Sequence, residues 1–483
     1  MIEELRNERI KKLNALRNLG YDPYPAVGNR THPIGDALRD FVALTKRRRR
    51  ITVSGRVVGL RNQGSLFFAD LRDESGAIQF VVKKENLPDF SVFRDNLDIG
   101  DFLEGTGIPF KTKRGEKSIE VAKLRFLTKS LRPLPSQWHG LTDSETRLRK
   151  RYLDLLLNEE LKELFRKKAL FWGATRDFLT KQGFLEVETP ILEAVPGGAD
   201  AEPFVTHHNA LDEDFYLRIS LELYQKRLIV AGFEKVFEIG RIFRNEGIDA
   251  EHLQDYSQME FYWAYADYHV LMKFVEKMYK TIIKSVFGTL KISLGKETID
   301  WGKRWPMIDY CEAFQEANRI NLKSARTQTL FERARQLNLN VEEGCGRGRL
   351  IDAIYKKTVR PSFVQPAFLV NHPVDVSPLA KRDPRHPDRV ERFQVVACGS
   401  ELGNGWSELN DPLDQRARFE EQAKLRAAGD KEAQMLDEDF VEALEYGMPP
   451  TAGFGFSERL FAVLADRPVR EAVMFPSMRK KSV

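Results

Sequence analysis

Two charged residues at the end of a predicted strand could bind a phosphate. Apolar residues from Val236 to Phe243 predict a buried strand, and the alternation from Met259 to Tyr265 predicts its partner. Arg244 ends the first strand, and Glu246 follows two residues later. A guanidinium offers a rigid fork of donors to phosphate or carboxylate oxygens, and a carboxylate accepts from an amine or hydroxyl. The pattern favours a triphosphate site, although an isolated pair of this kind is more often a surface ion pair.

Polar residues near the C-terminus could complete the site. Asn404, Trp406 and Glu408 share one face if their segment is extended. Further on, a glycine-rich strand runs into a helix with Arg459 at the junction. The sequence contains no GxxxxGK[ST] loop, so arginines and a metal ion would have to hold a nucleotide triphosphate. Arg244 and Arg459 are the candidates.

The elements that position these residues divide the chain. Short alternating strands fill residues 51–130, and five strands over this length predict a small closed barrel of the OB type. Such barrels bind single-stranded nucleic acid by stacking bases on aromatic side chains and reading base edges with amides or carboxylates. Phe68, Gln79 and Glu116 have suitable side chains, although by composition alone Phe68 is more often a core residue.

Prolines in residues 131–145 predict a linker to a second domain, 146–483. That domain opens with a helix from roughly Asn158 to Gln182, which Gly183 would end. Helical patterns at about 311–358 predict an insertion. Residues 1–50 contain a basic helix and the run Lys46–Arg50, which suits a phosphate contact or a solvated linker about equally. The predicted fold class is α+β, with a five-stranded barrel followed by an antiparallel sheet flanked by helices.

Size and composition favour a packed enzyme over a disordered scaffold. The 483 residues allow two or three domains, and 42% are hydrophobic. The net charge of +5 is mild. Three cysteines without CxxC spacing predict reduced thiols and no cysteine-held zinc. No apolar run approaches the roughly 20 residues that cross a bilayer, so we expect a cytoplasmic protein that does not enter a membrane.

Several segments resemble the class II aminoacyl-tRNA synthetases. The stretch FEIGRIFRNEGIDAEHLQDYSQMEFYWAYADY resembles motif 2 of that family, and its end, like RISLELYQKRL, is similar to the lysine-specific members of subclass IIb. The helix and strand that end near Pro190 look like motif 1, which forms the family's dimer interface, and the segment around Arg459 looks like motif 3. The resemblance implies a homodimer that uses ATP and Mg²⁺ to activate lysine as the adenylate. It then transfers lysine to the 3′ end of tRNA(Lys).

The resemblance also implies roles for individual residues. Arg244 would bridge the α-phosphate and the substrate carboxylate, with Arg459 on the far side. The nucleotide contacts would be Glu246, His252 and Tyr256, with Tyr256 stacked on adenine, and Glu401 would bind Mg²⁺ and ATP. In the barrel, Phe68 and Gln79 would hold the central uridine of the anticodon. Glu116, on the next hairpin, would also belong to the anticodon-binding site. The implied lysine-binding residues are Gly198, Glu222, Glu260, Tyr262, Asn404, Trp406 and Glu408.

The acidic residues support lysine on physical grounds. A pocket for lysine must neutralise an ammonium at the end of four methylenes, which calls for more than one carboxylate and a phenol or aromatic wall. Glu260, Tyr262 and Glu408 meet this requirement, which leaves Glu222 and Asn404 for the α-amino and carboxylate ends. An aspartate-specific pocket would contain cations instead.

The sequence departs from the family pattern at three places. Gln394 stands where the family has a glutamate that shares Mg²⁺ with Glu401, which predicts a weaker or missing metal site. The loop after His252 reads Leu-Gln-Asp at 253–255 where the family has Asn-Pro-Glu. Motif 3 is about one residue short before Arg459.

Two other functions compete with this interpretation. The first is a subclass IIb synthetase for asparagine or aspartate, or a paralogue that lysylates a protein. The second is a non-catalytic RNA-binding paralogue that has kept its barrel and a degenerate synthetase domain. The presence of Arg244, Glu246, Glu401 and Arg459 argues against the second. Gln394 and the short motif 3 keep it open.

Overall fold

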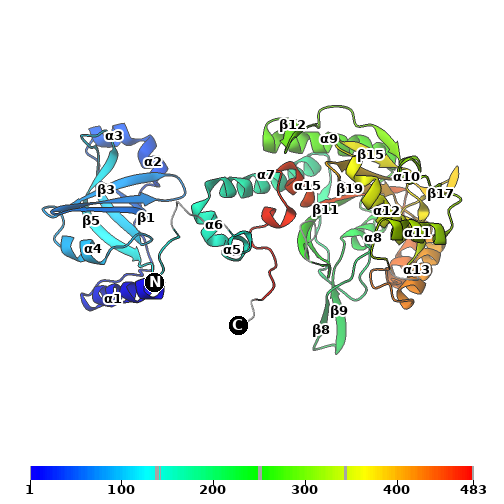
Figure 1. Ribbon diagram of the computed structural model, residues 1–483, viewed down its shortest axis with the longest axis horizontal. Coiled ribbons are helices and arrows are strands. Elements are labelled where there is room, and N and C mark those ends of the chain that lie inside the picture. Colours follow the sequence, from blue (N-terminus) through cyan, green and yellow to red (C-terminus); the bar gives the residue numbers. More distant parts are fainter. Residues whose placement is uncertain (1, 136–140, 142, 248–252, 342–344, 481–483) are drawn as a thin grey trace. The chain divides into compact units, whose positions relative to one another are not determined.

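The computed structural model describes residues 2–135, 141, 143–247, 253–341 and 345–480. The chain divides into two compact units, Met1–Thr142 and Asp143–Val483, whose elements are drawn in Figure 1. Each unit contains hydrophobic core clusters of its own. Within the described ranges, no helix has the length and apolar character needed to cross a membrane.

The first unit contains a closed five-stranded barrel with the strand order β1-β2-β3-β5-β4. Strands β3 and β5 are parallel, and the other neighbours are antiparallel. The barrel therefore has the strand count that the sequence predicts, and this part of the fold prediction is confirmed. The elements are α1 (Ile2–Asn18), α2 (Ile34–Arg39), α3 (Phe41–Lys46), β1 (Ile51–Gln63), β2 (Leu66–Arg72), β3 (Ala77–Lys83), α4 (Phe90–Asn96), β4 (Phe102–Lys111) and β5 (Lys117–Thr128).

The period-2 pattern of β2 separates the barrel interior from its surface. Phe67, Ala69 and Leu71 are fully buried, whereas Phe68 and Asp70 point the other way and are partly exposed. Side chains of the three N-terminal helices join the same core, so residues before the first strand pack as part of this unit.

The second unit is built on an eight-stranded sheet with the order β14-β15-β18-β19-β20-β11-β10-β6. Only two neighbouring pairs among its described strands are parallel, β14 with β15 and β10 with β6. The predicted antiparallel sheet is confirmed. The strands of this unit are β6 (Leu185–Glu186), β7 (Leu192–Glu193), β8 (Val205–His208), β9 (Glu213–Leu217), β10 (Lys235–Phe243), β11 (Asp255–Ala264), β12 (Lys291–Leu294), β13 (Glu297–Asp300), β14 (Met307–Asp309), β15 (Ala367–Val370), β16 (Arg382–Asp383), β17 (His386–Val390), β18 (Arg392–Ala397), β19 (Ser400–Ser407) and β20 (Thr451–Ser457).

Helices cover one face of this sheet. The core cluster beneath it combines residues of α7, α9 and α15 with inward residues of the central strands, such as Phe261, Phe393 and Phe454. Figure 1 shows α7, α9 and α15 beside the sheet. Gly183, with φ of +83°, follows the last turn of α7 in a backbone conformation that favours glycine, as expected for a residue that ends a helix. The helices are α5 (Ser144–Arg149), α6 (Arg151–Leu157), α7 (Glu159–Lys181), α8 (Glu222–Val230), α9 (Tyr268–Phe287), α10 (Tyr310–Asn318), α11 (Thr327–Gln336), α12 (Arg347–Thr358), α13 (Pro412–Ala427), α14 (Glu438–Glu445) and α15 (Arg459–Leu464), with short 3₁₀ turns η1 (Arg360–Ser362), η2 (Val374–Val376) and η3 (Val469–Ala472).

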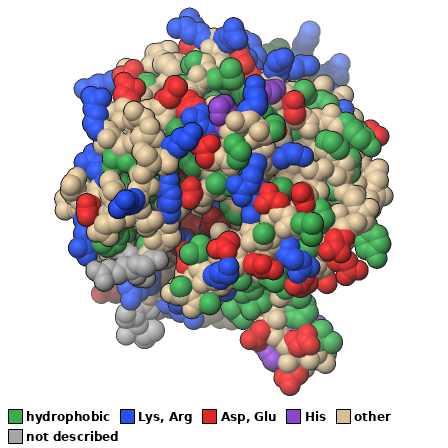
Figure 2. All heavy atoms as spheres, turned by 90° about the vertical axis from the view of Figure 1, so that its right-hand side faces the viewer, with side chains coloured by type: hydrophobic (Ala, Val, Ile, Leu, Met, Phe, Trp, Pro, Cys, Tyr) green, Lys and Arg blue, Asp and Glu red, His purple; other side chains and the backbone are tan. Residues whose placement is uncertain are grey.

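Two smaller features decorate the second unit. Helices α10, α11 and α12 pack around a separate core cluster that also contains Leu369 of β15, within the region where the sequence predicts a helical insertion. The hairpin of β8 and β9 projects from the body of the unit, and Figure 2 shows acidic and histidine side chains gathered on it.

Candidate active site

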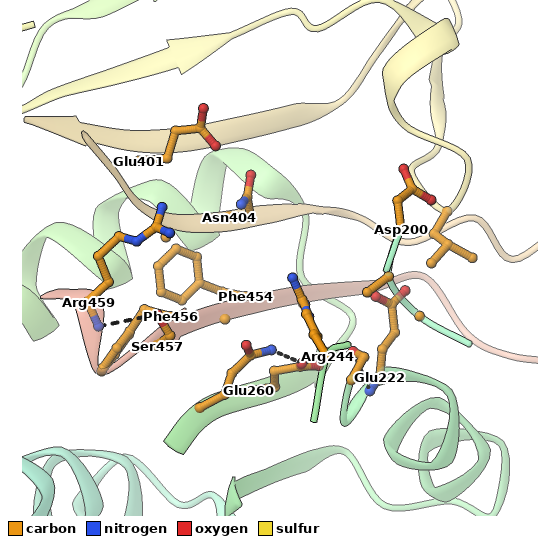
Figure 3. A pocket seen from close by; sticks show the side chains of 18 of the residues that line it. Asp200, Glu222, Arg244, Glu260, Glu401, Asn404, Phe454, Phe456, Ser457 and Arg459 are labelled. Carbon is orange, nitrogen blue, oxygen red and sulfur yellow. Dashed lines mark hydrogen bonds between the residues drawn. The ribbon is translucent and has the colours of Figure 1, made fainter. Parts of the chain in front are cut away.

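A cavity of about 760 Å³ opens on the face of the large sheet opposite the helices. Pockets that bind small molecules commonly have this size. Figure 3 shows its side chains: Arg244, Glu222 and Glu260 lie toward one end, and Glu401 and Arg459 toward the other. Strands β11, β19 and β20 supply the wall because alternate residues of neighbouring strands point to the same face.

The β10–β11 hairpin places Arg244 at the cavity. Arg244 is the first residue after β10, and its backbone N–H donates to Gln254 O at 2.8 Å, which closes the two sides of the loop. Its side-chain Nε donates to Ile219 O at 3.3 Å, and its guanidinium carbon lies 5.8 Å from the centre of the Tyr256 ring. Glu246 also lines the cavity. The residues of the predicted phosphate site that the structure describes therefore lie together; His252 lies outside the described residues.

A β-bulge brings Glu401 to the same face as Asn404. Opposite β18, Gly403 pairs with Val395 but Glu401 pairs with Val396, so Leu402 is the extra residue. Without the bulge, positions 401 and 404 would point to opposite faces, because side chains alternate along a strand. Gln394, which pairs with Asn404, occupies the same face.

One end of the cavity is strongly acidic. Glu260 is buried, and its Oε1 accepts from Ser220 Oγ at 3.0 Å, from Leu221 N at 3.2 Å and from Gln258 Nε2. Its Oε2 accepts from Tyr262 Oη at 2.9 Å. Neutral donors therefore hold both oxygens of this carboxylate.

Two more carboxylates share one buried ammonium. Lys226 Nζ lies 2.5 Å from Glu222 Oε1 and 2.5 Å from Glu408 Oε2, and all three side chains are buried. Trp406 Nε1 donates to the same Glu408 oxygen at 2.7 Å. The sequence suggested Glu222 for the other end of a bound amino acid, but the structure groups Glu222 with Glu408 through Lys226.

Two glycines keep this end of the cavity open. A Cβ atom on Gly453 would lie 2.3 Å from Glu408 Oε1 and 2.4 Å from the Tyr262 ring. Gly198 has φ of +86°, and a Cβ there would approach Glu222 Cβ to 2.9 Å. Side chains at these positions would displace the acidic groups, which explains why glycine is needed at both.

Burial changes the protonation of the acidic end. It raises the pKa of Glu222 to about 8 and that of Glu408 to about 7, and the charge of Lys226 opposes both shifts. Burial also raises the pKa of the Tyr262 phenol well above its usual value, so this group stays a hydrogen-bond donor. For Lys226, burial lowers the pKa, and the charges of Glu222 and Glu408 raise it by more. The cluster attracts cations.

The opposite end of the cavity carries the second arginine. Arg459 begins α15 directly after β20, and its backbone N–H donates to Ser457 Oγ at 3.3 Å. The preceding Glu458 is buried and pairs with Lys168 of α7. The short form of this segment thus still brings Arg459 to the cavity.

The donors near Glu401 suit a metal ion that arrives with its own ligands. Gln394 Nε2 donates to Glu401 Oε2 at 3.3 Å, and no described residue donates to Glu401 Oε1 or Gln394 Oε1, both buried. Over the described ranges, no three His, Cys, Asp or Glu side chains gather as a metal site. One carboxylate fits Mg²⁺ when phosphate oxygens and water complete the shell.

Four cations in or next to the cavity were not predicted from the sequence. Lys226 follows Glu222 by four residues on one helix, a spacing that signals an ion pair. Arg392 lies on the same strand face as Gln394 and donates to Asn404 Oδ1 at 2.9 Å, which strand alternation could have indicated. Lys356 and Arg360 come from α12 and η1. No local sequence pattern links these two to the other cavity residues.

The barrel presents a second candidate surface. Asp70 pairs with Gln79 and Phe68 with Val81 across β2 and β3, so Phe68 and Gln79 share the outer face. Gln79 is held by Asp70 Oδ1 at 3.3 Å and by Ser118 Oγ at 3.1 Å. Phe68 is partly exposed, so the core position that composition alone favours is not observed. Exposed Glu116 lies in the turn before β5, and residues 46–50 are also exposed.

Comparisons with known proteins agree with this geometry. Residues 143–479 match a family model described as tRNA synthetases class II (D, K and N), and residues 51–127 match an OB-fold nucleic acid binding domain. The chain is 46% identical to a lysine–tRNA ligase of Roseiflexus castenholzii, with 99% of each chain covered. It is 44% identical to that of Moorella thermoacetica and 42% identical to that of Bacillus subtilis, with 99% of this chain and 98% of each relative covered.

The raised carboxyl pKa values predict a pH-dependent stability. A carboxyl group whose pKa is higher in the folded than in the unfolded chain adds stability at low pH, and this stability is lost as the pH rises through the folded-state pKa. Glu222 and Glu408 meet this condition, so the melting temperature of the second unit should fall between about pH 5 and pH 8. Glu408→Gln removes one such group, and Lys226 keeps Glu222 as its partner. The decrease in melting temperature over this pH range should therefore be smaller in the variant. Thermal unfolding at several pH values measures this decrease.

Glu442→Gln provides the control, because Glu442 is exposed on α14. This variant should keep the pH dependence of the wild-type protein. Equal slopes for the wild-type protein and Glu408→Gln would contradict the pKa assignment.

Proposed function

The chain belongs to the class II tRNA synthetases of the D, K and N group, and we propose that it is a lysine–tRNA ligase. The observation that carries the proposal is the buried cluster of Glu222, Glu260, Tyr262 and Glu408 at one end of a cavity that also holds Arg244 and, at its opposite end, Arg459. An amino acid with a terminal ammonium suits the acidic end, and a triphosphate suits the arginines. The lysine–tRNA ligase names of the relatives agree with this assignment.

The proposed first step joins lysine to AMP. The lysine carboxylate attacks the α-phosphorus of ATP, a new P–O bond forms, and the bond to the β-phosphate breaks to release pyrophosphate. The carboxylate is already ionised at neutral pH, so no general base is needed. Negative charge grows on the phosphoryl oxygens, and the fixed guanidinium groups of Arg244 and Arg459 stabilise it. In the second step, a hydroxyl at the 3′ end of tRNA attacks the adenylate carbonyl and AMP leaves.

The described residues among the remaining nucleotide and lysine contacts line the same cavity. We assign Tyr256 to the adenine ring, and Glu246, with His252, to other parts of the nucleotide. Gly198, Asn404 and Trp406 line the cavity beside the acidic cluster and suit the backbone and stem of lysine. We propose that Mg²⁺ accompanies ATP and that Glu401 is its protein ligand, with Gln394 offering an amide oxygen. The ion would neutralise phosphate charge.

We further propose that the enzyme is a cytoplasmic homodimer. Cys311 and Cys398 have free thiols, and this agrees with a reducing compartment. Strand β6 lies at the edge of the large sheet, and Leu185, Ile191 and Leu192 in and after it are about half exposed. Exposed apolar residues along a sheet edge favour association with another chain.

Amino-acid-dependent exchange between ATP and pyrophosphate tests the catalytic proposal. We expect exchange with lysine and none with asparagine or aspartate, because the pocket is acidic. Arg244→Ala and Arg459→Ala should each lower the rate by about 10²–10³, the effect of removing a preorganised charge. The surface variant Arg416→Ala should keep the wild-type rate.

The other functions make different predictions for the same assay. Exchange with asparagine or aspartate would show that the acidic cluster has been misassigned. Absence of exchange with all three amino acids would favour the non-catalytic RNA-binding protein.

The barrel surface predicts a separate effect on tRNA. Phe68→Ala removes a stacking platform worth about 1–3 kcal/mol per base, so the KM for tRNA(Lys) should rise by about tenfold or more while lysine-dependent exchange stays unchanged. Val27→Ala, at an exposed position in the same unit, is the control. An unchanged KM in Phe68→Ala would exclude this face as the anticodon site.

The proposed dimer is tested by sedimentation. Leu185→Glu puts a charge on the exposed edge strand and should shift the protein from the dimer mass toward the monomer mass at micromolar concentration. Leu413→Glu introduces the same change at an exposed position on α13 and should remain dimeric. A dimer that tolerates Leu185→Glu would place the interface elsewhere.

A further inference from the structure

The two oxygens of the Glu408 carboxylate have different surroundings. Oε2 lies 2.5 Å from Lys226 Nζ and accepts from Trp406 Nε1 at 2.7 Å. Oε1 is equally buried, and no described residue donates a hydrogen bond to it. A buried carboxylate oxygen without a donor is costly. This atom is therefore suited to a donor supplied by a ligand.

Oε1 of Glu408 lies against a glycine that lines the cavity. A Cβ on Gly453 would come within 2.3 Å of this oxygen, so the absence of a side chain there leaves the approach clear. Gly453 and Tyr262 both line the acidic end of the cavity, and Glu408 Oε1 lies next to Gly453. Glu260 is less suited to a new donor, because neutral groups of the protein already donate to both of its oxygens.

Lys226 is fixed more firmly than a surface lysine. It is fully buried on α8, one helical turn after Glu222, and its ammonium also bonds to Glu222 Oε1 at 2.5 Å. The ring centre of Phe440 lies 5.8 Å from the same nitrogen. These partners fix the position of the ammonium. From this position it bonds to Oε2 of Glu408 and not to Oε1.

We propose that Lys226 is a positioning residue that orients Glu408 so that Oε1 receives the side-chain ammonium of the substrate lysine. This inference rests on the proposed function and names the atom that recognises the substrate. Lys226 also lowers the pKa of Glu222 and of Glu408, which favours the ionised form of both in a buried site. The substrate ammonium is then the second cation in a cluster that already contains one.

The ionisable groups around the cluster of Lys226, Glu222 and Glu408 come from three elements. Glu222 comes from α8, Glu260 and Tyr262 from β11, and Glu408 from the end of β19. Lys226 lowers the pKa of both Glu222 and Glu408, against the larger effect of burial. Without Lys226 these carboxyl groups would hold their protons to higher pH, and a protonated carboxyl group is a poor acceptor for an ammonium.

The test is calorimetric binding of lysine and of ATP to the full-length protein between pH 6 and pH 9. For Lys226→Met we expect at least tenfold weaker lysine binding at pH 7 and an acid limb of the affinity profile that moves to higher pH, with ATP binding unchanged. Lys226→Arg, which keeps the charge, should restore the position of the acid limb. Lys273→Met, at an exposed position on α9, is the control.

A merely structural role gives a different result. If Lys226→Met folds and binds lysine as the wild-type protein does, or loses affinity equally at every pH, the proposal is wrong. If Lys226→Met does not fold, the single variant Glu222→Gln is compared with the double variant Glu222→Gln/Lys226→Met. The double variant buries no unpaired charge on α8. The acid limb of the lysine-affinity profile should still move to higher pH when Lys226 is lost. If it does not move, the inference is wrong. A wild-type protein that binds ATP but no lysine would instead reject the proposed function.

Discussion

The burial of three carboxylates at one end of a single cavity is the constraint on which the site depends. Glu222, Glu260 and Glu408 are each at most 4% exposed, and carboxylates at such depth require cations or several donors. The structure meets this requirement in two ways, with a resident ammonium for Glu222 and Glu408 and with neutral donors for Glu260. The result is an acidic end that is stable enough to fold and still able to accept one more cation.

The large sheet separates this chemistry from the packing that supports it. One face is apolar and rests on α7, α9 and α15, so the strands are held by a continuous core. The other face carries charged groups from β11 and β19, and glycines of β20 lie between them. Because each strand contributes to both faces, the position of a reactive group is set by the packing of its neighbours on the opposite side. The acidic end and the arginines are therefore parts of one rigid surface.

Much of this arrangement could be predicted from local sequence patterns. Alternation along 259–265 predicts β11 and the shared face of Glu260 and Tyr262, and five short strands predict the barrel. The grouping of Glu222 with Glu408 could not be predicted, because it depends on how α8 packs beside the end of β19. Lys356 and Arg360 reach the cavity only through the docking of a separate helical cluster. The orientation of Glu408 is set by Lys226, whose role appears only when its distances to both carboxylates are known.

The bulge at Leu402 has a consequence for how this sequence can change. It resets the alternation of side chains along β19, so Glu401 and Asn404 share a face although they are three positions apart. Without a bulge, two side chains share a face when an even number of positions separates them. Loss of one residue between Glu401 and Asn404 would leave them two positions apart, and gain of one would leave them four apart, so a regular strand would keep both on one face after either change. The present spacing of three positions is the one that requires the bulge. The side chain at 402, now buried against the helices, is what a shortened strand would have to give up.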